Sequence, residues 1–389
     1  MEKLVYVDRR NTNCNKWDGQ QKMFGEEGLH AMWVADMDFR VPECVVSALR
    51  EYVESGVYGY YKIPDAYYQA FIDWEREHHG YEVKKEWIRF SPGVVAGFHW
   101  LLQILTEEND AVIVNTPVYY PFLDAVKNNH RNLICSDLKN ENGEYSIDFD
   151  DFEKKITDHQ VKLFILCSPH NPAGRVWKKE EIQKFMDICK KHDVLVFSDE
   201  IWSDLVRKEN THIPTQSVSE DAKKRTIAAY APSKTFNLAG LVGSYHIVYD
   251  KYLRDRLNKQ ASLSHYNSPN ILSVHALMGA YCKEGLDWVN ELNEVISNNI
   301  DYALDFIHNN FKGIEVIKPE GTYMLYLDCT KYLDTHDITM DELLKKGVHY
   351  GVCWQDGRPF MNPNTIRMNL ALPTSLVEEA FSRLKEFVF

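Results

Sequence analysis

Three polar residues, Lys234, Asp199 and Asn171, each end or follow a short apolar run typical of a β-strand. A lysine desolvated at a strand end can have a lowered pKa and act as a nucleophile or base. Asp199 is suited to hold a cationic heterocycle, and Asn171 to donate a hydrogen bond. Taken singly, each residue has a plainer interpretation as a surface lysine, a solvated acid or an Asn-Pro turn.

Three further positions extend this set. Residues 91–97 place a Pro-Gly turn before an apolar helical run at 98–105, and free N–H groups at a helix start bind phosphate. Tyr119 follows another strand, where its ring is either core or a stacking surface. Arg367 interrupts an apolar strand, so it needs an anion, and a guanidinium suits a carboxylate.

Alternating strands and helices position these residues. One helix is predicted over 178–192, where apolar residues recur on one face. This alternation is typical of a mainly parallel sheet, in which ligands lie at the carboxyl ends of the strands. The strands are predicted at 111–117, 161–169, 194–200, 226–230 and 244–249.

The last part of the chain has a different, α+β pattern. A long helix is predicted from about 268 to 305, and the first forty residues are irregular and aromatic. We expect a large domain over 45–265 and a smaller α+β domain formed by 1–44 and 266–389. Strands are predicted at 313–316, 322–327 and 365–370, and helices at 340–346 and 376–389.

Together these residues match the needs of pyridoxal phosphate. Its aldehyde needs a lysine, its ring nitrogen an acid that keeps the ring an electron sink, and its phenolate oxygen a donor. Its phosphate needs N–H groups, and an amino-acid substrate needs an arginine.

Composition excludes several other classes of protein. The 389 residues carry 44 Lys+Arg and 57 Asp+Glu, so the net charge of −13 disfavours binding to nucleic acid or an anionic membrane. We see no membrane helix, no signal peptide and no motif for a P-loop or a dinucleotide. The eight cysteines are scattered, which predicts free thiols in a reducing cytoplasm. No CxxC or HExxH motif occurs, so we expect no metal site.

Nearly the whole chain resembles the fold-type I pyridoxal-phosphate enzymes of the class I and II aminotransferase group. It is most similar to the cystathionine β-lyase-like C–S lyases, and the Ala-Asp-Met-Asp-Phe block favours that branch. The resemblance implies an α/β large domain with a mainly parallel, seven-stranded type of sheet covered by helices. The matching blocks are 16–18, 33–39, 57–60, 91–95, 116–119, 168–174, 198–201, 233–237, 320–323 and 367–369.

The resemblance implies a role for each candidate residue. Lys234 would bind the cofactor aldehyde covalently and serve as the catalytic base. Asp199 would pair with the ring nitrogen, Asn171 would donate to the 3′ oxygen, and Tyr119 would stack on the ring. Arg367 would hold the substrate carboxylate.

The resemblance also implies how the phosphate is held. Gly93, Val94 and Val95 would offer backbone groups, and Tyr60 would reach the phosphate of a neighbouring subunit. A homodimer with shared sites follows. Many transaminases also carry a Ser and an Arg on the phosphate, at positions that are Ala231 and Val242 here. The phosphate would therefore depend more on Ser233, Tyr60 and the 93–95 turn.

We therefore predict a lyase acting on cystathionine or cysteine-type L-amino acids by α,β-elimination, with a thiol, pyruvate and ammonia as products. An aminotransferase would use the same residues, and a regulatory protein could keep the cofactor only as a ligand. We find no second arginine for a dicarboxylate, which favours the lyase. The lyase branch often has His after Asp-Glu-Ile, where this chain has Trp202.

Overall fold

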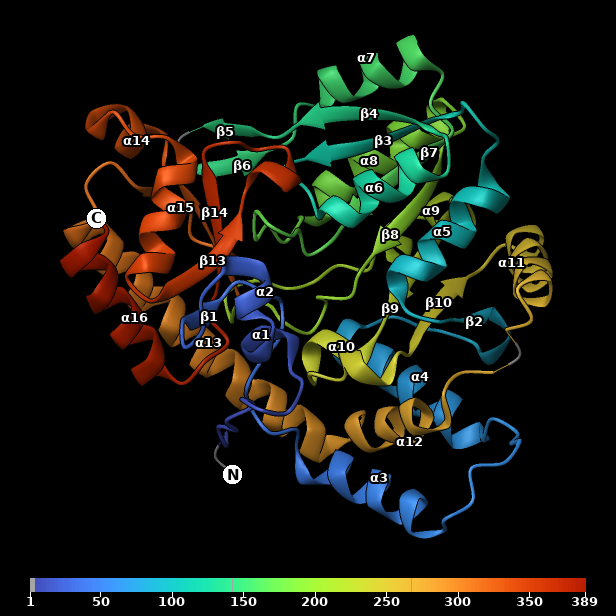
Figure 1. Cartoon of the computed structure of the whole chain (residues 1–389). Coiled ribbons are helices and arrows are strands. Elements are labelled where there is room, and N and C mark those ends of the chain that lie inside the picture. The colour runs from blue at the N-terminus through green and yellow to red at the C-terminus, as the bar shows by residue number, and fades with distance from the viewer. Residues whose placement is uncertain (1–3, 142, 267) are drawn as a thin grey trace.

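A computed structural model describes residues 4–141, 143–266 and 268–389. A seven-stranded sheet between helices lies beside a five-stranded sheet (Figure 1). The mixed α/β class that the sequence predicted is confirmed. A separate two-stranded sheet consists of β5 (Lys139–Glu141) and β6 (Glu144–Ser146).

The large sheet has the order β2-β10-β9-β8-β7-β3-β4. Only β10 pairs antiparallel with its neighbours, so the sheet is mainly parallel as predicted. The five expected strands are present, whereas the two edge strands β2 and β4 were not predicted. The strands are β2 (Ile88–Ser91), β3 (Ala111–Thr116), β4 (Asn132–Asp137), β7 (Leu163–Cys167), β8 (Leu195–Asp199), β9 (Thr226–Tyr230) and β10 (Ser244–Val248).

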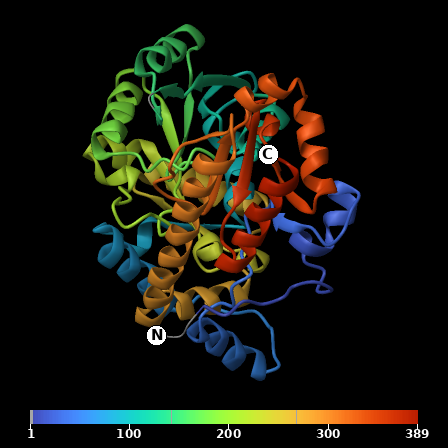
Figure 2. The ribbon, with the colours of Figure 1, turned by 90° about the vertical axis from the view of Figure 1, so that its left-hand side faces the viewer.

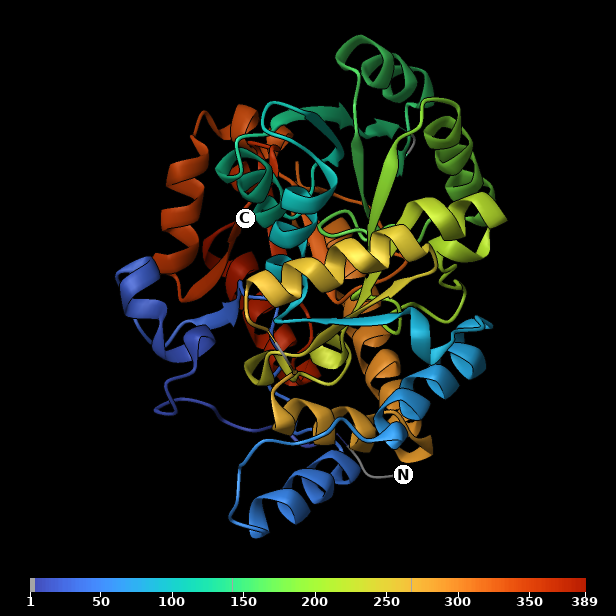
Figure 3. The same ribbon diagram turned by 90° about the vertical axis from the view of Figure 1, so that its right-hand side faces the viewer.

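Helices cover both faces of this sheet, which explains why its central strands are apolar throughout. On one face, Val112 and Phe197 pack with α5 (Val94–Leu105), α6 (Tyr120–Asn128) and α11 (Lys251–Leu263). Figure 3 shows α11 crossing in front of the sheet. On the other face, Phe164 and Val196 pack with the helices α7 (Phe149–His159), α8 (Lys179–Lys191) and α9 (Glu220–Arg225).

The five-stranded sheet joins the two ends of the chain. Its order is β1-β13-β14-β12-β11, and β1 pairs in parallel with β13. Figures 1 and 2 show α1 (Asn15–Asp18) and α2 (Gln20–Phe24) beside it. This pairing supports the proposed small domain. The strands are β1 (His30–Met32), β11 (Glu315–Val316), β12 (Met324–Asp328), β13 (Val352–Asp356) and β14 (Thr365–Asn369).

The single long helix predicted from about 268 is two helices, α12 (Ile271–Ala280) and α13 (Lys283–Asn310). Cys282 has extended backbone angles and caps α13, with its Sγ accepting a hydrogen bond from the Gly285 N–H. A Cβ on Gly285 would lie 1.8 Å from the Ala280 carbonyl oxygen, so a glycine permits this tight junction. The helical spacing of apolar residues continues across this junction, so the sequence pattern did not reveal where one helix ends and the next begins.

The remaining helices complete the packing around the two sheets. In the described ranges, no helix is long and apolar enough to cross a membrane. These helices are α3 (Glu43–Glu54), α4 (Asp65–His79), α10 (Pro232–Thr235), α14 (Thr330–His336), α15 (Met340–His349) and α16 (Thr374–Phe387), with 3₁₀ turns at Lys85–Trp87, Thr215–Ser217, Ala239–Leu241 and Arg358–Phe360.

Candidate active site

A cavity of about 180 Å³ lies where β3, β7, β8 and β9 end. Larger hollows of about 630 and 880 Å³ lie elsewhere and contain none of the predicted site residues. Eight of those residues line the smaller cavity: Gly93, Val94, Val95, Tyr119, Asn171, Asp199, Ser233 and Lys234.

Lys234 projects from α10, the short helix that follows β9. Its Nζ donates a 2.9 Å hydrogen bond to the Ala35 carbonyl oxygen and lies 5.6 Å from the centre of the Trp202 ring. Burial, aided by the positive charge of Arg367, lowers the pKa of Lys234 to about 8. A larger fraction of this amine is therefore neutral near pH 7 than for a surface lysine, as a nucleophile or base requires.

Asp199 is the last residue of β8 and is buried at the cavity wall. Burial raises the pKa of its carboxyl group to about 7. Its Oδ1 accepts a 3.2 Å hydrogen bond from the Ile201 N–H. In the described chain it has no ion pair, so a cationic N–H in the cavity would supply the missing partner.

Arg367 comes from β14 in the other sheet, yet its Nη1 donates 3.1 Å to Asn171 Oδ1. Its Nη2 donates 3.2 Å to the Trp33 carbonyl oxygen, and its guanidinium packs on Phe360. The side chain is buried, and its Nε has no hydrogen-bond partner among the described atoms. A buried guanidinium that meets only neutral acceptors is suited to receive a carboxylate.

The aromatic wall and the helix start complete the cavity. Tyr119 precedes α6, and burial raises the pKa of its hydroxyl to about 12, so the ring presents a neutral face. Gly93 has a φ of 98°, a left-handed value that favours glycine, and it precedes the first turn of α5. The first N–H groups of a helix lack partners within it, so Val94 and Val95 can offer theirs to an anion.

These groups fit pyridoxal phosphate: a partly deprotonated lysine, a buried acid without a cation, an amide, an aromatic ring and a helix N-terminus. Ala231 and Val242 also line the cavity, so neither adds a polar side chain for the phosphate. Tyr60 lies outside the cavity of its own chain and is fully exposed. Its predicted role therefore depends on a second copy.

Sequence reasoning missed the backbone contribution of residues 33–35. The carbonyl oxygens of Trp33 and Ala35 accept hydrogen bonds from Arg367 and Lys234, respectively. The Ala-Asp-Met-Asp-Phe block that includes Ala35 was noted only as a family signature. Main-chain acceptors exist at every residue, so only the position of this block could have suggested the contact.

Comparisons with known proteins agree with this site. The family described as aminotransferase class I and II matches residues 34–384. Cystathionine beta-lyase PatB from Bacillus subtilis is 36% identical over 385 residues, covering 97% of both chains.

Two solved structures are also similar over almost the whole chain. Cystalysin from Treponema denticola, which contains pyridoxal 5′-phosphate, has a TM-score of 0.93 at 32% identity and covers 98% of this chain and 97% of its own. The pyridoxal-phosphate-bound C–S lyase from Staphylococcus hominis has a TM-score of 0.91 at 34% identity, covering 99% and 97%. The chain therefore belongs to the class I and II aminotransferase family.

Proposed function

We propose that this chain is a pyridoxal-phosphate-dependent C–S β-lyase acting on L-amino acids of the cystathionine or cysteine type. The observation that carries this proposal is the convergence of Lys234, Asp199 and Asn171 on one cavity, with Arg367 hydrogen-bonded to Asn171. Full-length similarity to a cystathionine β-lyase supports the lyase branch. The products are a thiol, pyruvate and ammonia.

When bound, pyridoxal phosphate supplies a protonated ring that accepts the electron pair released at the substrate Cα. Lys234 would hold its aldehyde, and Asp199, as a carboxylate, would keep the ring nitrogen protonated. Asn171 accepts from Arg367 and would donate to the 3′ oxygen. Tyr119 would pack against the ring.

Arg367 binds the substrate carboxylate and so orients Cα toward Lys234. As a free amine, Lys234 would remove the Cα proton with the lone pair of its Nζ. The electron pair of the Cα–H bond then forms a Cα–Cβ double bond as the Cβ–S bond breaks. The sulfur leaves with the electrons of that bond, and hydrolysis of the remaining enamine gives pyruvate and ammonia.

A homodimer would complete the phosphate site. Tyr60 is fully exposed, and the neighbouring Val57 and Tyr58 are more than half exposed, an apolar cluster that a second copy would cover. The Tyr60 hydroxyl would then join Ser233 and the start of α5 on the partner's phosphate. The cytoplasmic location that the cysteine pattern suggested stays a prediction.

The test is incubation of the purified holoprotein with L-cystathionine, with and without a 2-oxo acid. We expect pyruvate to accumulate stoichiometrically with thiol in both reactions. A requirement for the 2-oxo acid, with a new amino acid formed, would instead establish the aminotransferase alternative. Cofactor binding without turnover of any amino acid would establish the regulatory alternative, and either outcome overturns the proposal.

A further inference from the structure

Residues 33–38 form a segment without regular secondary structure, which we name the strap. All six of its consecutive carbonyl oxygens accept a hydrogen bond from outside the strap. The donors come from the N-terminal segment, from the large sheet's α10 region and from β14. Such complete use of main-chain acceptors in an irregular segment indicates a fixed conformation.

The strap contacts both residues that are proposed to act on the substrate, Arg367 and Lys234. The Trp33 carbonyl oxygen accepts from Arg367 at 3.2 Å, and the Ala35 carbonyl oxygen accepts from Lys234 at 2.9 Å. Arg367 belongs to β14 of the five-stranded sheet, whereas Lys234 belongs to α10, which follows β9 of the seven-stranded sheet. The strap is thus a short, direct connection between the group that would bind the carboxylate and the group that would move the proton.

Asn369 fixes the peptide that faces Lys234. Its Nδ2 donates to the carbonyl oxygens on both sides of Ala35, at 2.7 Å to Val34 and 2.6 Å to Asp36. The Asp36 N–H also donates 2.9 Å to the Val34 carbonyl oxygen, which closes a three-residue turn around Ala35. The Ala35–Asp36 peptide is therefore held at both its N–H and its carbonyl.

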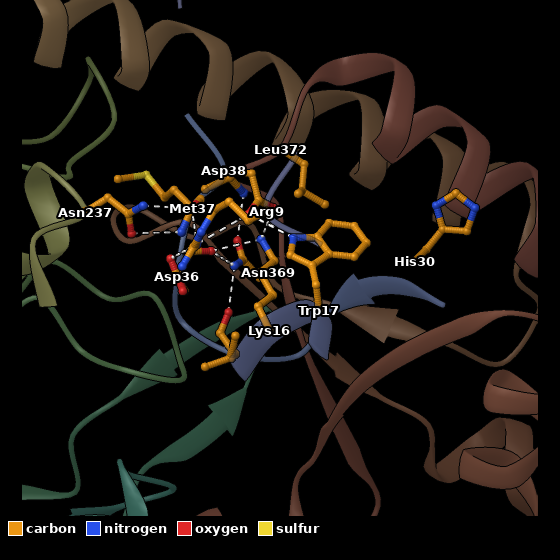
Figure 4. Close-up of polar contacts among 12 residues, drawn as sticks. Arg9, Lys16, Trp17, His30, Asp36, Met37, Asp38, Asn237, Asn369 and Leu372 are labelled. Atoms are coloured by element: carbon orange, nitrogen blue, oxygen red, sulfur yellow. Dashed lines mark hydrogen bonds and ion pairs between the residues drawn. The ribbon is translucent and has the colours of Figure 1, made fainter. Parts of the chain in front are cut away.

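Asn237, Lys16 and Arg9 hold the rest of the strap, and Arg9 Nη1 donates 2.8 Å to the Met37 carbonyl oxygen (Figure 4). Asn237, three residues after Lys234, accepts from the Met37 N–H at 3.1 Å and donates to its carbonyl oxygen at 2.8 Å. Lys16 donates 3.1 Å to the Asp36 carbonyl oxygen and pairs at 2.7 Å with Asp38, both side chains being fully buried. Removing one partner of a buried ion pair is strongly destabilising, so this contact is costly to break.

We propose that the strap positions the free Lys234 amine through the Ala35 carbonyl oxygen, and that Asn369 and Asn237 are the positioning residues that keep this acceptor in place. This inference rests on the proposed function and deepens it. Donating one N–H to Ala35 fixes the orientation of the amine, so its lone pair points in a defined direction. Proton removal then needs no search among amine orientations.

The test measures proton transfer without elimination. L-Alanine has no leaving group on Cβ, so exchange of its Cα proton in D₂O, followed by NMR, reports the Lys234 step alone. We expect Asn369→Ala to lower the exchange rate per bound cofactor about ten- to a hundredfold. We also expect a shift in the pH titration of its visible absorption band. Both readouts are normalised to the cofactor-bound fraction.

Asn299→Ala is the matched control, because Asn299 is also fully buried and bridges two carbonyl oxygens, those of Leu370 and Leu372. It should lose comparable thermal stability but keep the native exchange rate within about twofold and the native titration. An equal loss of exchange in both variants, or native exchange in Asn369→Ala, would overturn the inference.

If Asn369→Ala does not fold, Asn237→Gly tests the other anchor. Asn237 has a φ of 55°, which glycine adopts freely, and Asn109→Gly is its control at a φ of 70° far from the strap. Only the first should slow exchange, and equal rates would refute the proposal. If the unmutated holoprotein exchanges the Cα proton of L-alanine but forms no pyruvate from L-cystathionine, the proposed lyase activity is refuted. The inference about the strap is then unaffected.

Discussion

Two adjacent buried acids, Asp199 and Glu200, differ sharply in their surroundings. Glu200 accepts hydrogen bonds from His212 at 2.8 Å, Tyr230 at 2.6 Å and Ser198 at 2.8 Å. Burial acts to raise its pKa, but these partners outweigh burial and the pKa is lowered. Asp199 has one backbone donor among the described residues, and burial raises its pKa to about 7.

This difference fits a structural role for Glu200 and the proposed cofactor-binding role for Asp199. Glu200 points to the side of β8 where partners within the chain satisfy it. Asp199 faces the cavity, and the cost of burying its charge is left for a bound cation to offset. An unpaired buried charge beside a cavity is thus a more specific indicator of a site than burial or charge alone.

Among substitutions in the cavity, Lys234→Ala should have the largest effect on activity. Losing both the covalent attachment and the base should lower pyruvate formation from L-cystathionine at least about a thousandfold. The chain should remain folded, as circular dichroism would verify. Borohydride reduction of the native holoprotein followed by peptide mapping should label Lys234, and labelling of another lysine would contradict the assignment.

Asp199→Asn and Glu200→Gln test the comparison directly. Asp199→Asn should lower kcat about a hundred- to a thousandfold with little change in Tm, because an amide does not keep the ring nitrogen protonated. Glu200→Gln should cost about 3 kcal/mol of unfolding free energy, with near-native turnover per folded site. If the two variants exchanged these phenotypes, the assignment of structural and functional acids would be reversed.

Tyr60→Phe tests whether the cofactor cavity is completed by a second copy of this chain. A hydroxyl bonded to an anion contributes about 1.5–3 kcal/mol, so cofactor affinity should fall about ten- to a hundredfold. Tyr58→Phe, on the same exposed segment, is the control and should bind the cofactor normally.

Mixing Tyr60→Phe with Lys234→Ala subunits identifies the subunit that Tyr60 serves. In the hybrid dimer, the one intact Lys234 would lie beside a native Tyr60 from its partner. Cofactor affinity at that site should then return to the native value, and affinity that stays at the mutant level would reject the shared site.

The pH dependence of cofactor rebinding should show the smallest effect. Burial lowers the Lys234 pKa to about 8, and only the neutral amine attacks the aldehyde. In cofactor-free protein the rebinding rate should therefore rise about tenfold per pH unit and level off above about pH 8. A rate that keeps rising toward pH 10, as for an ordinary lysine, would show that the amine is not desolvated.

The sequence predicted that the candidate residues around the cavity lie together, because parallel strands bring their carboxyl ends to one edge of the sheet. Asp199 ends β8, and Lys234, Asn171 and Tyr119 follow β9, β7 and β3, so each was expected near the others. Fully apolar runs located those central strands. The edge strands β2 and β4 are mixed in composition, and most of their residues are only partly buried or exposed, so periodicity did not reveal them.

The strap could not be predicted, because its contribution comes from carbonyl groups that every residue possesses. Ala35 carries no chemical mark of its contact with Lys234. Asn369 and Asn237 were visible in family blocks, but an asparagine that bridges two backbone groups looks the same in a sequence as one in a turn. The parallel pairing of β1 with β13, more than 300 residues apart, likewise leaves no local signal.

That pairing also makes the small sheet and the base mechanically dependent on each other. The strap begins directly after β1, so a tilt of the five-stranded sheet would carry the strap with it. Such a tilt would stretch the bonds from Ala35 to Lys234 and from Met37 to Asn237. The tilt of the small sheet and the position of the Lys234 amine would then be coupled, so a ligand that favours one tilt would also favour the matching amine position.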